Sequence, residues 1–294
     1  MIEESKLGYY MMPILKVWLF MFFLLLCTIP FGLISQFGFL PPISSSIVRD
    51  IIAQFSLLTV VLGALLMMFK VFPDLNFHEV FIRKEGVLPA FFKGAGLGFL
   101  MMLLCALLLY ANGNVKFENA EISWSSVCLY LFYFLLISIF EEFLFRSYPL
   151  FAFSERYPFW FAIVVNGFLF ALAHFANPGL TVLGVINITL AGILFSLYTL
   201  QKRHISWAIG IHFAWNFTQA VILGYNVSGN EMSGMVRAIP QGAVYISGGE
   251  FGIEGSMYCT ILLIISIGWL LYRNGFGTMD NQEVEELDYD EHEG

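Results

Sequence analysis

The sequence predicts an all-α membrane protein, a bundle of about eight transmembrane helices. Three observations predict this class. Hydrophobic residues make up 59% of the 294 residues and charged residues only 12%, whereas a soluble domain carries about 25% charged residues. The apolar residues form runs close to the roughly 20 residues that a helical span needs. Lys and Arg gather in alternate connections between these runs, as in polytopic membrane proteins.

Each apolar run is a candidate helix, because lipid leaves backbone groups no partner outside a helix or a closed barrel. The runs lie near residues 12–35, 51–72, 89–111, 125–148, 158–176, 179–200, 205–225 and 256–273. The first run is too long for the apolar core of a signal peptide, so we expect it to remain as a span. We expect residues 1–278 to form one transmembrane domain and residues 279–294 an acidic, disordered tail.

The placement of positive charge predicts that both termini face the cytoplasm. With that orientation, only Arg49, Lys116 and Arg237 of the 14 Lys and Arg residues lie on the outer side. The outer side then also holds the segment 225–256, which is rich in Gly, Ser and Asn. Segments of this length are often functional lids, and we expect Glu254 to close the outer face of a cavity.

The charge and cysteine patterns exclude two other classes. The net charge of −8 comes from the acidic tail, and the nearly neutral remainder has no basic surface for a nucleic acid partner. Cys27, Cys105, Cys128 and Cys259 each lie in or beside an apolar run, without metal-ligand spacing. They predict neither a disulfide framework nor a cysteine metal site.

Acidic and basic residues end the fourth run. Glu142 and Arg146 are four residues apart, so they share a helix face and can form an ion pair. Glu141 is rotated by about 100° and lacks that partner, which suits a general base. Taken alone, the motif also fits an acidic and basic cluster at a helix end.

His174 lies near the end of the fifth run. If the fourth and fifth helices form a hairpin that turns near residues 156–158, Glu141 and His174 lie at equal depth. This requires the fourth helix to continue past Pro149, where a kink would weaken the inference. A histidine with only a structural role is the alternative.

His212 and Asn216 share one face of the seventh run. They predict a polar cavity, or else hydrogen bonds between helices. A carboxylate with an imidazole can activate water, and a second imidazole with an amide can stabilise an oxyanion. One difficulty is depth, since His212 lies only 8 residues past His204, whereas Glu141 and His174 lie about twice as far from their own turn.

The three motifs resemble those of the CAAX-protease and bacteriocin-processing family of intramembrane glutamate proteases, also called Abi proteins. That family's pattern is EExxxR, then FxxxH, then HxxxN or HxxxD. Here the pattern reads Glu141-Glu142-xxx-Arg146, Phe170-xxx-His174 and His212-xxx-Asn216, within residues 125–220.

The resemblance implies an endopeptidase that acts on a membrane-associated or lipidated protein or peptide. Glu141 would be the general base and His174 would help to hold the attacking water. His212 and Asn216 would form the oxyanion hole, with Glu142 and Arg146 in support. The bacterial members of the family suggest the cytoplasmic membrane of a bacterium, with lipid as the surrounding partner.

Three alternatives remain open on the sequence. Glu141, His174 and His212 could bind zinc, although HExxH is missing and we expect no cofactor. The chain could also be a non-enzymatic immunity or scaffold protein, or a transporter. We expect His78 and His204 to be solvated surface residues.

Overall fold

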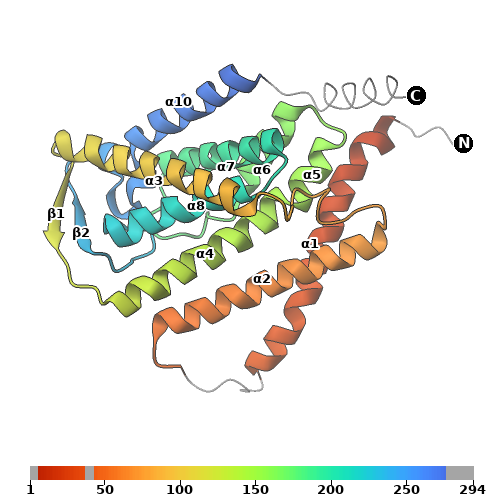
Figure 1. Ribbon diagram of the computed structural model, residues 1–294, viewed down its shortest axis with the longest axis horizontal. Helices are drawn as coiled ribbons and strands as arrows, with labels where there is room; N and C mark the ends of the chain where they lie inside the picture. Colours follow the sequence, from red (N-terminus) through yellow and green to blue (C-terminus); the bar gives the residue numbers. More distant parts are fainter. Residues whose placement is uncertain (1–5, 37–42, 276–294) are drawn as a thin grey trace, which may run out of the picture.

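The computed structural model describes residues 6–36 and 43–275, which are predominantly helical (Figure 1). Within these residues, six helices are long and apolar enough to cross a membrane. They are α1 (Lys6–Gln36), α2 (Ser46–Val71), α3 (Val87–Ala111), α4 (Trp124–Arg146), α7 (Val182–Lys202) and α10 (Met257–Asn274). The protein is therefore a polytopic membrane helix bundle, as predicted. The tail expected at residues 279–294 lies outside the described residues.

Two of the eight expected spans are shorter than predicted. The run at 158–176 forms α6 (Phe159–Leu172), which has 14 residues and reaches only about 21 Å at 1.5 Å per residue. The run at 205–225 forms α8 (Ser206–Phe217), followed by a π-helical turn, η1 (Thr218–Ile222). Hydropathy could not show that residues 173–176 are in turns, because their side chains are nearly all apolar.

The fourth helix ends before Pro149, so the continuation that the hairpin argument required does not occur. α4 ends at Arg146, and the short helix α5 (Tyr148–Ser154) follows. Pro149 has no N–H to offer the carbonyl of Phe145. The side-chain amide of Asn166 on α6 donates to that carbonyl instead, at 2.6 Å. The break at Ser147 is thus satisfied by a neighbouring helix.

Glycines bring α3 and α8 unusually close. A Cβ atom on Gly94 would collide with the carbonyl oxygen of Trp207, and one on Gly98 with that of Ile211. Small residues allow such close packing in membranes, where lipid removes most of the hydrophobic drive for helix association. The α8 backbone is therefore held against α3 along the segment that carries His212.

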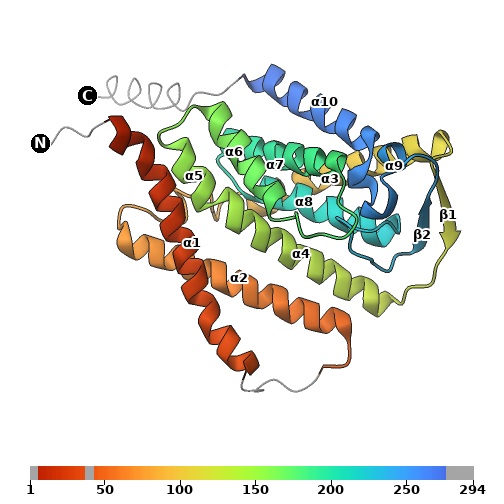
Figure 2. The ribbon, with the colours of Figure 1, turned by 180° about the vertical axis from the view of Figure 1, so that it is seen from behind.

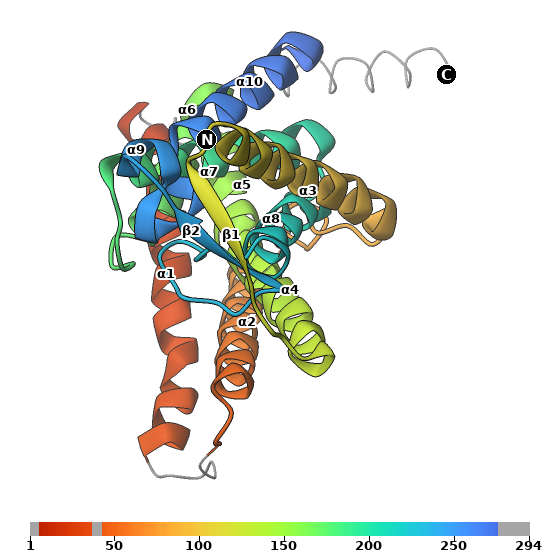
Figure 3. The same ribbon diagram turned by 90° about the vertical axis from the view of Figure 1, so that its left-hand side faces the viewer.

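A two-stranded antiparallel sheet closes one end of the bundle. β1 (Val115–Asn119) follows α3, and β2 (Val236–Pro240) lies in the segment between α8 and α10. Figure 3 looks onto this end, which we call the sheet end. The alternating residues of these short strands were not recognised in the sequence. The sheet ties the predicted lid segment to the connection between α3 and α4.

α1 and α2 form a separate layer beside α4 and α5 (Figure 2). Their contact centres on Phe20, Leu65 and Tyr148, all fully buried. Lys16 on α1 also forms a 2.7 Å ion pair with Glu155 at the end of α5. The outward faces of this layer carry large apolar side chains, which suits contact with lipid.

Candidate active site

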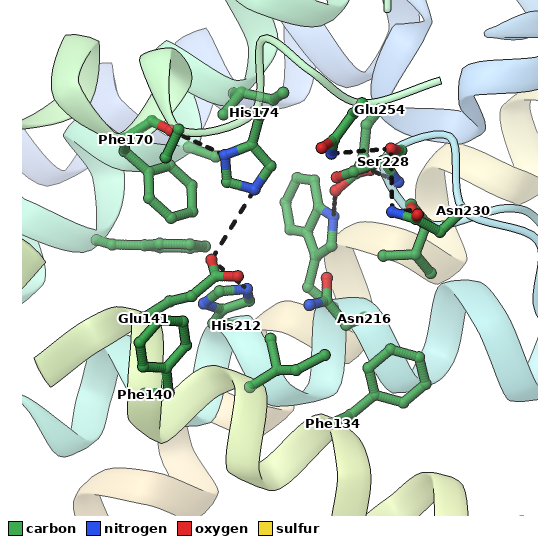
Figure 4. Close-up of a pocket in the computed structure, with 18 of the residues that line it drawn as sticks. Phe134, Phe140, Glu141, Phe170, His174, His212, Asn216, Ser228, Asn230 and Glu254 are labelled. Carbon is green, nitrogen blue, oxygen red and sulfur yellow. Dashed lines mark hydrogen bonds and ion pairs between the residues drawn. The ribbon is translucent and has the colours of Figure 1, made fainter. Parts of the chain in front are cut away.

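A cavity of about 450 Å³ lies among α4, α6, α7, α8 and the segment before α10. All four residues predicted to be catalytic line it. Figure 4 shows Glu141, His174 and His212 gathered at one end, which we call the acid–imidazole end. Ser228, Asn230 and Glu254 lie at the other, here the turn end. The polar ends face apolar side chains on α4, including Phe134 and Phe140.

Glu141 faces two imidazoles. Its Oε2 lies 3.9 Å from Nε2 of His174 and 3.9 Å from Nε2 of His212. Among the described residues, this buried oxygen has no hydrogen-bond partner. Because 3.9 Å is too long for a direct hydrogen bond, the spacing suits three groups that share one bridging water.

The opposite nitrogen of each ring fixes its orientation. Nδ1 of His174 lies 2.8 Å from the carbonyl oxygen of Phe170, and a carbonyl can only accept. Nδ1 of His212 lies 2.8 Å from Oε1 of Glu142. Both Nδ1 atoms therefore donate, and both Nε2 atoms are directed toward Glu141.

Glu142 and Arg146 form the predicted ion pair behind the cavity. Their Oε1 and Nη1 atoms are 3.2 Å apart, and both side chains are fully buried. Arg146 also donates to the carbonyl of Gly192 and packs its guanidinium 4.1 Å from the ring centre of Phe170. Because Glu142 also binds His212, the pair supports the imidazole orientation.

The amide of Asn216 faces the cavity between its two ends (Figure 4). The residue is buried, yet no side-chain hydrogen bond to the other described residues occupies its amide. His212 lies one turn earlier on the same helix. Asn216 is therefore free to donate to a group that enters the cavity.

The break at Ser147 removes the depth difficulty for Glu141. Glu141 lies five residues before the end of α4, and His212 lies six residues after the start of α8. The sequence interpretation had counted α5 as part of the fourth helix, so it placed Glu141 too deep. His174 lies just past the end of α6 and still reaches Glu141.

The expectation for His204 was wrong. This residue is buried and its Nε2 donates to the carbonyl of Glu85 at 2.9 Å, while its Nδ1 accepts from the N–H of Ser206. It joins the turn between α7 and α8 to the connection before α3. His78 is exposed, as expected.

Sequence reasoning missed most of the turn end. Trp215, Gln219 and Ser228 donate to the carboxylate of Glu254. Gln219 lies in an apolar run, and a polar side chain at membrane depth is a signal that could have identified it. Ser228 gives no such signal, because it lies among other polar loop residues.

The three groups at the acid–imidazole end do not have the spacing of a zinc site. Tetrahedral zinc with bonds near 2.0 Å holds its ligand atoms about 3.3 Å apart, whereas these nitrogen–oxygen distances are 3.9 Å. No group of three or more His, Cys, Asp or Glu residues in the described ranges is arranged to hold a metal ion.

Fold and cavity together define an integral membrane protein that holds carboxylates, imidazoles and an amide in one buried chamber. Residues 123–218, which carry all three motifs, match the family described as Type II CAAX prenyl endopeptidase Rce1-like. The match confirms the resemblance to CAAX proteases over that stretch. The family is described as one of endopeptidases. No match to the chain was found among curated proteins or solved structures.

Proposed function

We propose that the protein is an intramembrane endopeptidase that hydrolyses a peptide bond with water activated between Glu141 and His174. The observation that carries the proposal is the unpartnered Oε2 of Glu141, which faces two imidazole nitrogens inside a cavity. The family match over residues 123–218 supports the reaction class.

In the first step, Glu141 takes one proton from water, and the remaining O–H of that water donates a hydrogen bond to Nε2 of His174. The water oxygen bonds to the carbonyl carbon of the substrate, and the carbonyl electron pair moves to its oxygen. The C–N bond then breaks, and the proton held by Glu141 passes to the departing amine. The products are a carboxylic acid and an amine, and transfer of the acid's proton to the amine gives the carboxylate and ammonium forms.

His212 and Asn216 are proposed to stabilise the oxyanion. Nδ1 of His212 already donates to Glu142, so donation from Nε2 requires both ring nitrogens to carry protons. That charge state balances the cluster, because Glu141 and Glu142 then face His212 and Arg146. A neutral cluster is the least costly arrangement at membrane depth.

The substrate is proposed to be a membrane-associated or lipidated protein or peptide. The apolar wall of the cavity on α4 suits a lipid chain or an apolar segment, and its polar ends suit a polypeptide backbone. The charge bias supports an orientation with both termini in the cytoplasm, and the resemblance to bacterial members of the family supports a bacterial cytoplasmic membrane.

The test compares the wild type with Glu141→Ala in membranes. Substrates are identified as proteins whose cleaved form is present only with the wild type, with abundance of both variants matched by immunoblot. The proposal expects such proteins, and cleavage of a farnesylated CAAX peptide is the direct assay. Identical proteomes and identical phenotypes would instead favour an immunity or scaffold role.

A further inference from the structure

At the turn end, residues Val227–Asn230 form a tight turn whose two central residues both adopt left-handed backbone conformations. Val227 and Asn230 exchange backbone hydrogen bonds of 3.0 and 2.9 Å. The two central residues have positive φ values, 47° at Ser228 and 82° at Gly229. This is the requirement of a type I′ turn, and Ser228 adopts it against the preference of an L-residue.

Glu254 holds this turn in place. Its Oε2 accepts from the backbone N–H of Ser228 at 2.6 Å and from the Ser228 hydroxyl at 2.8 Å. Charged acceptors make such bonds strong, which offsets the strain at Ser228. From the other side, the Asn177 amide donates to the Ser228 carbonyl at 3.0 Å. The turn is thus fixed from two directions.

The same carboxylate joins the turn to α8. Nε1 of Trp215 donates to Oε1 of Glu254 at 3.1 Å, and Nε2 of Gln219 lies 3.3 Å from Oε2. Trp215 immediately precedes Asn216. Glu254 therefore sets the distance between the turn and the residue proposed to stabilise the oxyanion.

A second, more polar cavity of about 1030 Å³ lies on the other side of the turn. It is bounded by residues between 224 and 250, which include β2, and by residues 120–121 and 178–179. Asn230 and Met232 line both cavities. The turn therefore stands where a chain in the polar cavity would pass toward Glu141.

We propose that the turn Val227–Asn230 is the wall along which the substrate polypeptide enters, and that Glu254 is the positioning residue that holds it. The Asn230 amide nitrogen donates within the turn to the carbonyls of Val227 and Ser228 at 3.3 and 3.4 Å, and the amide oxygen of this exposed residue can accept from a peptide N–H. The inference rests on the proposed function, because it assigns the polypeptide part of that substrate to the polar side of the turn.

The experiment measures access to the turn in full-length protein in proteoliposomes. The probe is a farnesylated CAAX peptide, and the readout is maleimide labelling of the Asn230→Cys variant, located by mass spectrometry. At a peptide concentration ten times Kd, we expect labelling to slow about tenfold. Glu254→Gln should reduce this protection to about twofold at the same peptide concentration and raise KM about tenfold, with kcat nearly unchanged. The matched control is Glu79→Gln, at a half-exposed residue that lines neither cavity.

A second pair guards against misfolding of Glu254→Gln. Ser228→Gly keeps the positive φ at no cost and should retain protection. Ser228→Val places a β-branched residue at positive φ and should lose it. Equal protection in this pair, or no protection in any variant, would overturn the proposal. So would a fall in kcat alone for Glu254→Gln.

The outcomes separate this inference from the proposed function. If Glu141→Gln still cleaves the peptide while residue 230 is protected, the proposed mechanism is wrong, but the proposal that the substrate enters along the turn is supported. If only the wild type cleaves and residue 230 is never protected, the wall is wrong and the mechanism stands.

Discussion

The two ends of the cavity each hold a buried carboxylate, and their surroundings differ sharply. Oε2 of Glu141 has no hydrogen-bond partner among the described residues. Glu254 accepts from Trp215, Gln219 and twice from Ser228. A carboxylate with filled lone pairs must lose bonds to take a proton, whereas an unsatisfied one need not. A carboxylate can therefore serve as a proton acceptor at the acid–imidazole end and as a structural hydrogen-bond acceptor at the turn end.

The largest effect is expected from a substitution of Glu141 at the acid–imidazole end. Glu141→Gln removes the proposed general base while keeping its shape, so cleavage should fall about 10³-fold. Binding of the farnesylated peptide, measured by protection of Asn230→Cys, should persist. Glu79→Gln, a half-exposed carboxylate on a loop away from both cavities, should cleave at the wild-type rate. Cleavage by Glu141→Gln within a few-fold of wild type would remove Glu141 from the chemistry.

The next effect concerns the support behind that end. Arg146→Met removes the guanidinium that pairs with the buried Glu142 and leaves the cluster with two carboxylates and one cation, which should lower the free energy of unfolding by about 3–5 kcal/mol. The more exposed pair of Lys16 and Glu155 gives the comparison, because Lys16→Met should cost about 1 kcal/mol or less. Thermal unfolding in detergent measures both, and equal melting temperatures for the two variants would contradict the assignment.

Asn216→Ala tests the residue between the two ends. Loss of one oxyanion donor should lower kcat about 10²-fold and leave KM nearly constant. The exposed Asn112→Ala serves as the control in steady-state cleavage of the peptide. A rise in KM without a change in kcat would instead place Asn216 in substrate binding.

The smallest expected effect is that of chelation. Exhaustive treatment with a zinc chelator should leave the cleavage rate unchanged, since the 3.9 Å spacings fit a shared water. If cleavage is lost on chelation and restored by added zinc, Glu141, His174 and His212 are better assigned as zinc ligands.

The sequence predicted the acid–imidazole end better than the turn end, for a physical reason. Ionisable residues are rare within apolar runs, so Glu141, His174 and His212 stand out as soon as the spans are placed. Glu254 lies among polar neighbours, and its partners come from α8 and from a turn 26 residues away in sequence. Only the folded chain shows that these groups meet. The roles of all the site residues stay predictions.

Helix boundaries were predictable where they depend on residues close by in the sequence. The long helices follow from hydropathy alone. The break at Ser147 does not, because it depends on both Pro149 and the Asn166 amide on another helix. The burial of His204 likewise depends on a carbonyl at Glu85, far away in sequence.

The close packing of α3 on α8 has a consequence for genetics. Gly94 and Gly98 line no part of the catalytic cavity, but a single added methyl group on either would push α8 aside. A shift of about 1 Å at a reacting group can cost 10²-fold in rate. A random mutational screen should therefore recover alanine at these glycines as stably produced, inactive alleles that resemble lesions in the catalytic motifs.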